Sequence, residues 1–326
     1  TFLRIREMII DAVPDSLKHA IAVGIGLFIA FIGFNGAGIV EKSDTGMLMR
    51  LGDLSRPPTL LACFGLLLII ALMARRIKGA ILVGILVTSV LAWVFDLVEW
   101  QGFVAAPPSM APTFMQLDLR GLLDAAMIPV IVIFLFMAVF DAIGTLIGVS
   151  ERAGLLRDGK LPRATRALLA DSSGTVVGSV LGTSTVTAYI ESATGVSAGA
   201  RTGLANMITG GLFVLALFFS PLVKMVGGGV PVDGGGVLQP MTSPALIVVG
   251  CLMVGSIRHI DWSDFTESFP AFLVMVGIPF AWSIADGIAF GFISYPALKL
   301  LTGRARDTSK LVYALGLLFV LRYVFL

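Results

Sequence analysis

Apolar residues along this chain occur in long runs that carry few charges and are separated by short polar segments. Most runs approach the roughly 20 residues that an α-helix needs to cross a bilayer. The pattern predicts an all-α polytopic membrane protein with about ten transmembrane segments. The predicted segments are 17–34, 59–75, 79–95, 122–149, 167–181, 183–200, 202–223, 243–257, 268–285 and 286–302. The last apolar stretch, 311–326, carries Arg322 and is left open as an interfacial helix or an eleventh span.

Composition supports the membrane assignment. Of the 326 residues, 57% are hydrophobic and 13% are charged, and the mean hydropathy is +0.96. Ordinary globular domains carry about 25% charged residues. These values exclude a soluble globular protein, a disordered chain and a nucleic-acid binder. We therefore expect the lipid bilayer as a partner and no nucleic acid.

The distribution of basic residues predicts the orientation, because cytoplasmic loops carry an excess of Lys and Arg. Alternate loops hold 17 of the 23 basic residues, the opposite loops hold five, and Arg322 is unassigned. The bias places the first set, and with it the C-terminus, in the cytoplasm of a multi-pass membrane protein, for which a bacterial inner membrane is expected. The chain begins at Thr1 with a charged stretch typical of a loop, so we also expect an N-terminal part to precede it.

An acidic residue inside a span is a functional hypothesis by default, because burying a carboxylate in lipid is costly. Asp141 lies within segment 122–149 and opens the motif D-A-I-G-T-L-I-G, and D-S-S-G-T-V-V-G follows thirty residues later. The spacing places four residues of each motif on one helix face. These residues are Asp141, Gly144, Thr145 and Gly148 in the first copy and Asp171, Gly174, Thr175 and Gly178 in the second. We interpret the glycines as packing residues and Asp141 as functional, since Ala would pack equally well without that cost.

Glu191 follows the run 183–188, which is rich in β-branched and hydroxyl residues and favours an extended segment. Extended backbone at membrane depth is tolerated only inside protein or beside a cavity. We therefore predict a broken span with a short strand near 183–189, after which Glu191 and Ser192 open a half-helix. Such broken spans mark binding sites in transporters. The alternative is an external loop, rich in Ser and Thr, with a solvated Glu191.

Three other polar residues receive structural interpretations. Asp286 is read as a turn residue between two spans, Asp171 as a helix cap, and His19 as a side chain that reaches toward the cytoplasmic surface. Two buried carboxylates beside one cavity suggest two roles, one binding ligand N–H groups and the other carrying a proton. This arrangement suits a neutral, N–H-rich ligand that moves with H⁺, and it suits an anion poorly.

Four stretches resemble the AzgA-type purine permeases, a branch of the nucleobase/ascorbate transporter superfamily. They are SLKHAIAVGIGLFIAFIG, FDAIGTLIGVSERAGLL, LLADSSGTVVGSVLGTSTVTAYIESATGVSAGARTGL and IADGIAFGFISYPALKLLTGR. The resemblance implies fourteen segments in two inverted repeats of seven, of which this chain holds segments five to fourteen. It implies gate-domain helices of the first repeat in 1–120, core-domain helices with the substrate site in 121–225, and gate-domain helices of the second repeat plus a C-terminal apolar helix in 226–326.

The resemblance also implies site residues. Asp141 and Glu191 match the acidic positions of segments eight and ten, and both are candidates for proton coupling, with the two roles left unassigned. Thr145 is expected to face the same cavity, and Ile190 and Ser192 to contribute backbone or hydroxyl contacts. Segments one to four, including the third segment that forms the other wall of the site, are absent from the chain.

The implied function is proton-coupled import of guanine, hypoxanthine or adenine through an elevator-like movement of core against gate. No cofactor is expected beyond the coupling proton, and a homodimer through the gate domain is possible in this family. Two alternatives remain at this stage. One is the same fold with another substrate, such as uracil, xanthine, urate or an anion, and the other is a membrane enzyme or a fragment without transport activity. The sequence contains no HExxH or P-loop motif that would support an enzyme.

Overall fold

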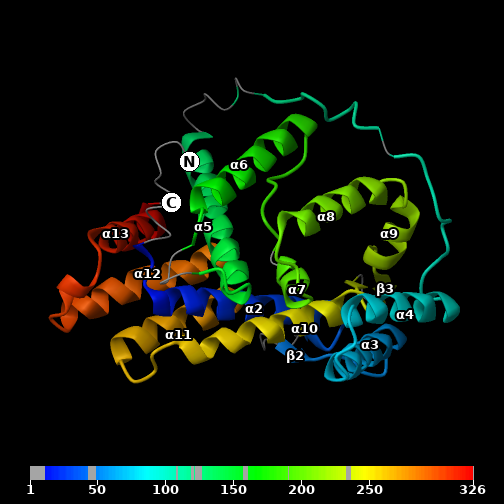
Figure 1. Cartoon of the computed structure of the whole chain (residues 1–326), viewed down its shortest axis with the longest axis horizontal. Helices are drawn as coiled ribbons and strands as arrows, with labels where there is room; N and C mark the ends of the chain where they lie inside the picture. Colours follow the sequence, from blue (N-terminus) through cyan, green and yellow to red (C-terminus); the bar gives the residue numbers. More distant parts are fainter. Residues whose placement is uncertain are drawn as a thin grey trace. The chain divides into compact units, whose positions relative to one another are not determined.

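The computed structural model describes residues 12–42, 49–107, 109–118, 121, 127–156, 161–189, 191–232 and 236–325. Within these ranges, some positions of the helices that span 128–152 and 310–325 are described by their backbone only: 128–130, 132, 133, 136, 137, 139–141, 152 and 325. The described residues are mostly helical, as Figure 1 shows, which agrees with the predicted all-α class.

The helices follow the predicted apolar runs. They are α2 (Asp15–Gly36), α3 (Pro57–Ala74), α4 (Ala80–Val94), α5 (Ile128–Arg152), α6 (Ala164–Leu181), α7 (Ser192–Ser197), α8 (Gly203–Ala216), α9 (Ser220–Gly227), α10 (Ser243–Val254), α11 (Phe265–Phe280), α12 (Ile284–Leu301) and α13 (Lys310–Phe325). Two short 3₁₀ helices, η3 (Gly255–His259) and η4 (Ala305–Asp307), follow α10 and α12.

Two small antiparallel hairpins, which the sequence analysis did not predict, lie between helices. Strand β1 (Val40–Lys42) pairs with β2 (Met49–Leu51), with Val40 opposite Leu51. Strand β3 (Val230–Val232) pairs with β4 (Gly236–Leu238), with Val230 opposite Leu238. Strands of three residues give a weak periodic signal, so hydrophobic patterning does not detect them.

The chain divides into two compact units. Unit 1 consists of Thr1–Phe28, Ser109–Ser197 and Met253–Leu326, and unit 2 consists of Ile29–Pro108 and Ala198–Leu252. Every predicted site residue belongs to unit 1. This division does not test the gate and core assignment made from the resemblance, which stays a prediction.

Unit 1 is built around the hairpin of α11 and α12, against which parts of α2, α5 and α13 pack. Glycines permit the closest approaches. A methyl group at Gly24 of α2 would lie 3.1 Å from the Val274 carbonyl oxygen, and one at Gly316 of α13 would lie 2.5 Å from that of Phe292. Backbones approach this closely only over small residues, as is typical of helix packing in membranes. Helix α5 also packs against α6 and α7, and these contacts position the candidate site.

Unit 2 contains the antiparallel pair α3 and α4. These helices also approach each other closely at glycines. A methyl group at Gly65 would lie 2.6 Å from Thr88 Cγ2, and one at Gly84 would overlap the side chain of Ile69. Thr88 itself is fully buried, and its hydroxyl donates a 2.9 Å hydrogen bond to the Gly84 carbonyl oxygen. The polar group is thus satisfied inside its own helix, which makes its burial inexpensive.

By length and composition, α2, α3 and α12 are each able to cross a membrane, and α8 with α9 would form a fourth span that is bent by 99°. The predicted total of ten spans stays a prediction. The run 202–223 is not the continuous helix that its apolar residues suggested. The break lies between Ala216 and Ser220, and Pro221 follows in the first turn of α9, where its missing backbone N–H is tolerated.

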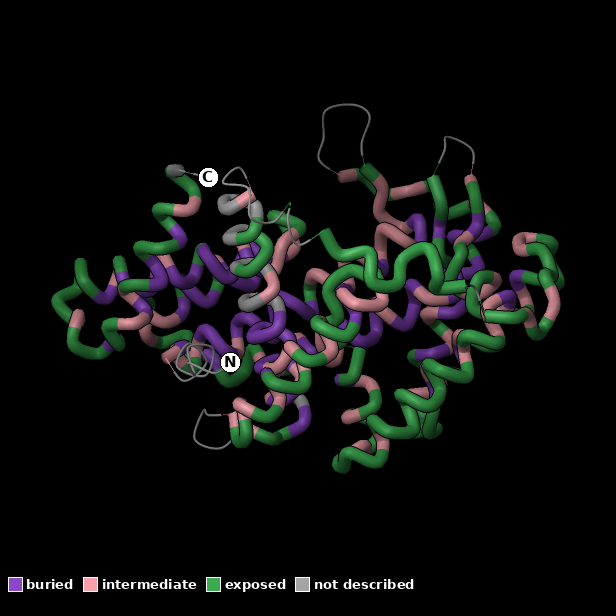
Figure 2. Tube along the Cα trace, turned by 90° about the horizontal axis from the view of Figure 1, so that it is seen from above, coloured by how far each residue is buried: buried purple, intermediate pink, exposed green. Residues whose placement is uncertain are grey.

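Large apolar side chains cover the outside of several helices. Helix α8 has no buried residue, and Leu212, Phe213 and Val214 are each more than half exposed. Figure 2 shows exposed positions running along much of the trace outside the buried helices. Soluble monomers rarely expose apolar surface on this scale. A lipid environment accounts for it.

Candidate functional site

The predicted site residues lie on two neighbouring elements of unit 1. Asp141 and Thr145 belong to α5, Glu191 directly precedes α7, and Ser192 is the first residue of α7. Ile190 lies outside the described residues, and Asp141 is described by its backbone alone. Because α5 and α7 pack against each other, the structure brings together the two elements that carry the predicted carboxylates.

The second half of α5 is buried on the face predicted from the first motif. Thr145 is only 4% exposed, and Gly144 and Gly148 are buried. A methyl group at Gly144 would lie 3.4 Å from side-chain atoms of Ile21, Ile25 and Ile284. This distance is ordinary van der Waals contact, so the face is closely packed without backbone strain. Gly144 therefore lies on a packing face that has room for a methyl group, so the predicted need for glycine at this position stays a prediction.

The segment predicted as broken, 183–200, is a non-helical stretch followed by a short helix, and it comes directly after α6. Helix α6 ends at Leu181, and its cap residue Gly182 has a φ of 80°, a left-handed conformation that favours glycine. The described residues 183–189 contain no helix and no strand, so the short strand predicted near 183–189 is wrong. The Val186 carbonyl oxygen accepts a 2.7 Å hydrogen bond from Thr175 Oγ1 of α6, so a side chain takes the place of a neighbouring strand.

Helix α7 begins at Ser192, so a short helix does follow Glu191. The Glu191 carbonyl oxygen accepts hydrogen bonds from Thr194 N at 2.9 Å and from Thr194 Oγ1 at 2.7 Å. Ala193 is 2% exposed, whereas the side chains of Glu191 and Ser192 are exposed. The backbone at Glu191 is therefore bonded to Thr194, whereas its side chain is exposed, so Glu191 is not the buried carboxylate that the sequence analysis expected.

Two interpretations of acidic residues are wrong. Asp171 does not cap a helix, because α6 begins seven residues earlier, at Ala164. Asp286 is more than a turn residue. It lies in the first turn of α12, where its backbone N–H donates to the Ser283 hydroxyl that caps the helix. Its Oδ1 lies 3.0 Å from Arg322 Nη1 and accepts a 2.5 Å hydrogen bond from the Tyr323 hydroxyl, so it joins α12 to α13.

The sequence analysis did not predict a polar contact between α2 and α5. His19 Nδ1 of α2 lies 2.5 Å from Glu151 Oε1, near the end of α5. The side chains are 20% and 10% exposed, and Glu151 Oε2 is buried with no hydrogen-bond partner among the described residues. Residues 132 positions apart form this pair, and no local pattern predicts such a contact.

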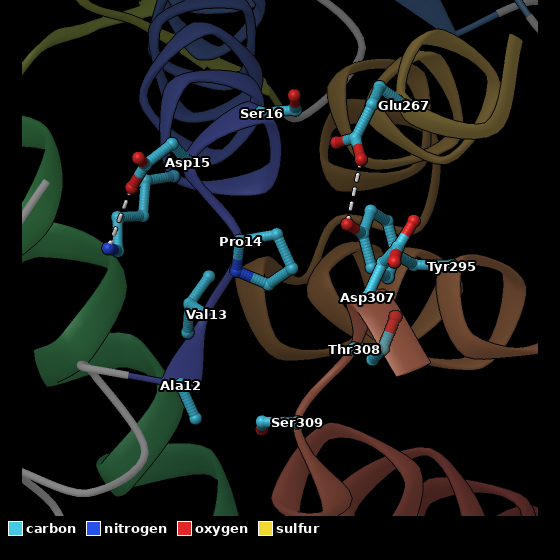
Figure 3. A pocket seen from close by; sticks show the side chains of 11 residues that line it. Ala12, Val13, Pro14, Asp15, Ser16, Glu267, Tyr295, Asp307, Thr308 and Ser309 are labelled. Carbon is cyan, nitrogen blue, oxygen red and sulfur yellow. Dashed lines mark hydrogen bonds and ion pairs between the residues drawn. The ribbon is translucent and has the colours of Figure 1, made fainter. Parts of the chain in front are cut away.

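The structure also contains a pocket of about 500 Å³ that is distant in sequence from the predicted site residues. Figure 3 shows it between the start of α2, the start of α11 and the segment that joins α12 to α13. Inside it, the Tyr295 hydroxyl donates a 2.8 Å hydrogen bond to Glu267 Oε1. The same oxygen lies 2.7 Å from Nζ of Lys299, which is 1% exposed. None of the predicted site residues lines this pocket, so it gives no support to the site.

Among the residues that the structure describes, no group of three or more His, Cys, Asp and Glu side chains is arranged to hold a metal ion. The candidate site as predicted contains two carboxylates and hydroxyl groups near them. Carboxylates accept hydrogen bonds when ionised and can carry a proton when neutral.

Apolar helices with exposed faces are typical of an integral membrane protein. Comparison with known families agrees, since the model of the permease family matches residues 1–290. The chain belongs to this permease family. It is an integral membrane transport protein rather than an enzyme.

Several curated relatives are similar over nearly the whole chain. A putative permease of Methanocaldococcus jannaschii is 46% identical over 100% of this chain and 72% of its own length. The guanine/hypoxanthine permease PbuG of Bacillus subtilis is 44% identical, covering 98% of this chain and 71% of that protein. The adenine permease AdeP of Escherichia coli is 43% identical, covering 100% and 71%. The resemblance to purine permeases that the motifs indicated is confirmed.

Proposed function

We propose that this protein imports a purine nucleobase, namely guanine, hypoxanthine or adenine, together with protons. The similarity to PbuG and AdeP, at 44% and 43% identity over 98% and 100% of the chain, carries the proposal. These two relatives are named for guanine/hypoxanthine and for adenine, so the proposal covers the three bases and does not rank them. The acidic character of the site also favours a neutral ligand with N–H groups over an anion, which would need a cation or a bare helix N-terminus beside it.

In the proposed site, Glu191 accepts hydrogen bonds from the ring N–H groups of the purine. Its exposed carboxylate stands directly before α7, and the backbone on that side is fixed by the bonds from Thr194. A carboxylate oxygen that accepts from a neutral N–H donor makes a charge-assisted bond, about twice as strong as a neutral one. Ser192 and Ile190 would add hydroxyl or backbone contacts beside it.

Asp141 would bind the opposite edge of the base or carry the coupling proton. It lies one helical turn before Thr145 on α5, the helix that packs against α7. A carboxyl group inside a bundle holds a proton more readily than one in water, because burial disfavours its charged form. Glu191 is the other candidate for the proton, and the proposal keeps both.

Transport would follow an elevator-like movement in which the core helices of 121–225 slide against the gate helices of 1–120 and 226–326. The C-terminus would lie in the cytoplasm, as the excess of basic residues in alternate loops indicates. A dimer through the gate helices would supply a fixed frame for this movement. These features extend the proposal from the substrate to the mechanism.

The test is uptake of labelled hypoxanthine, guanine and adenine by cells that express the complete protein and lack their own purine permeases. We expect saturable uptake that a protonophore abolishes and that unlabelled purines inhibit, whereas sulfate and uracil do not. Glu191→Gln should abolish uptake, and Glu99→Gln, which changes an exposed acidic residue outside the proposed site, should not. Uptake at the wild-type level by the Glu191→Gln variant would remove Glu191 from the site, and inhibition by sulfate alone would replace the substrate class.

A further inference from the structure

The second copy of the repeated motif makes a contact that the first copy does not make. On α6, the face formed by Gly174, Thr175 and Gly178 meets the non-helical segment that follows the helix, at Val186. On α5, the corresponding Gly144 faces isoleucine side chains of other helices. The same sequence pattern thus packs against other helices on α5, and against the non-helical segment that follows the helix on α6.

Val186 contacts α6 through both its side chain and its backbone. A methyl group at Gly174 would lie 3.5 Å from Val186 Cγ1, whereas one at Gly178 would lie 2.6 Å from Val186 Cγ2 and 2.9 Å from Thr183 Oγ1. The absence of a side chain at Gly178 therefore creates the space that Val186 occupies. Gly174 lies farther away and has room to spare.

The Thr175 hydroxyl makes the polar contact between α6 and Val186. Its oxygen lies 2.7 Å from the Val186 carbonyl oxygen and 3.1 Å from that of Asp171. The carbonyl of Asp171 lies within α6, where helical bonding already satisfies it. Val186 lies outside any helix or strand, and the Thr175 hydroxyl donates to its carbonyl.

The contacts between Val186 and α6 affect the position of Glu191. This residue lies five residues after Val186 and two before Ala193. Ala193 is buried at 2% exposure in α7, which packs against α5. The chain thus contacts α6 at Val186, before Glu191, and packs against α5 through α7, which begins directly after Glu191. If either contact is lost, the carboxylate keeps its chemistry and loses its position, and a displacement of about 1 Å is enough to weaken a binding site strongly.

We infer that Thr175 and Gly178 of α6 are positioning residues that hold the 183–189 segment, and through it Glu191, in the geometry that binds the transported ligand. This inference rests on the proposed function, because it takes Glu191 as the ligand-binding carboxylate. It adds two residues from a motif that was interpreted only as a packing face.

Four substitutions on α6 test the inference in the complete protein, with hypoxanthine as the probe. Thr175→Val removes the hydroxyl and keeps the shape of the side chain, and Thr175→Ser keeps the hydroxyl. Loss of one hydrogen bond of this kind corresponds to about a threefold to tenfold rise in the KM for hypoxanthine uptake. We expect this rise in Thr175→Val, a near-normal KM in Thr175→Ser, and normal amounts of both proteins in the membrane.

Gly178→Ala and Gly174→Ala form a matched pair one helical turn apart. The added methyl group overlaps Val186 only at position 178, so we expect a raised KM in Gly178→Ala and a KM within about twofold of wild type in Gly174→Ala. Ser173→Ala serves as a further control, because the exposed Ser173 hydroxyl bonds only to Leu169 of its own helix, at 2.7 Å. The thermal stabilisation that hypoxanthine gives to purified protein should follow the same order.

The controls separate this inference from the proposed function. If Glu191→Gln transports like wild type, the proposed site is wrong, whatever the α6 variants do. If Glu191→Gln is inactive while Thr175→Val and Thr175→Ser share the wild-type KM, the site stands and the positioning role is wrong. If Gly178→Ala fails to reach the membrane, the comparison of Thr175→Val with Thr175→Ser decides alone.

Discussion

His19 of α2 and Glu151 of α5 form a pair in which Nδ1 and Oε1 are 2.5 Å apart. The His19 ring also faces that of His259, with the ring centroids 5.2 Å apart, and Nε2 of His259 lies 3.2 Å from Arg258 Nε. The pair therefore connects α2 and α5 with the segment that follows α10. Glu151 is nearly buried, and among the residues that the structure describes only one of its oxygens has a hydrogen-bond partner, namely His19.

This pairing predicts that removing one partner costs more than removing both. Breaking a buried pair from one side leaves an uncompensated polar group and typically costs about 3 kcal/mol, whereas replacing both partners by apolar residues is often neutral. We expect His19→Leu to lower the thermal unfolding midpoint of the purified protein, and the double variant His19→Leu/Glu151→Leu to recover most of the loss. Additive losses in the double variant would show that the two side chains act independently.

The ion pair between Asp286 and Arg322 joins α12 to α13. We expect the removal of one partner to destabilise this contact as well. The side chains of Arg322 and Asp286 are 16% and 28% exposed, and the Tyr323 hydroxyl donates to the same carboxylate oxygen. Arg322→Leu should loosen α13, because it leaves the partly buried carboxylate of Asp286 without its charged partner. Hydrogen exchange of the α13 amides should become faster, while the amides of α3 and α4 stay unchanged. Tyr323→Phe should have a smaller effect, and equal protection of α13 in all variants would contradict the prediction.

Asp264, which caps α11, predicts how stability depends on pH. Its carboxylate accepts hydrogen bonds from Thr266 N at 2.9 Å, Thr266 Oγ1 at 2.7 Å and Arg304 Nη1 at 2.6 Å. The Thr266 hydroxyl, and after it the Arg304 guanidinium, hold the pKa of Asp264 well below its usual range. A lowered pKa in the folded state means that the contribution to stability is complete above the unfolded value of about 3.9 and is lost as the pH falls further.

We therefore expect Asp264→Ala to lower the unfolding midpoint at pH 7, and its difference from wild type to shrink as the pH falls below about 4. Asp264→Asn should lie between the two proteins at pH 7, because Asn still caps a helix but does not pair with Arg304. Thermal unfolding in detergent across this pH range is the measurement. A difference that stays constant into acid would show that the charge of Asp264 does not stabilise the fold.

The sequence predicted helix positions best where apolar runs end at strong local signals. Helix α3 begins at Pro57 and α4 at Ala80, within two residues of the predicted starts, because Pro57 and Gly79 interrupt the adjoining runs. The break after α6 was predictable for the same reason, since Gly182 and the β-branched residues after it disfavour a helix. The bend before Pro221 was missed because the apolar composition continues across it.

The pattern of hydrophobic and polar residues does not predict contacts between segments that are far apart in the sequence. Nothing near His19 in the sequence indicates that Glu151 will be its neighbour, and the same holds for Asp286 and Arg322. The strand expected near 183–189 failed because β-propensity does not indicate which group will satisfy the backbone. Here the donor is Thr175, eleven residues earlier on α6. Asp141 and Glu191 were predicted because the cost of a carboxylate in a membrane is visible in the sequence itself, and their role in a binding site stays a prediction.

Gly287 of α12 predicts a stability effect that opposes helix propensity. Replacing a helical Gly by Ala ordinarily stabilises a helix by about 1 kcal/mol. A methyl group at Gly287 would instead lie 2.5 Å from Ile278 Cα and even closer to the Ile278 amide nitrogen, and backbone atoms of α11 cannot move aside cheaply. Overpacking of this kind costs about 1 to 3 kcal/mol, so Gly287→Ala should lower the unfolding midpoint. Gly210→Ala on α8, where the methyl group meets nothing within 4 Å, should leave it unchanged or raise it. If Gly287→Ala behaves like Gly210→Ala, the close approach of α11 and α12 at this glycine is wrong.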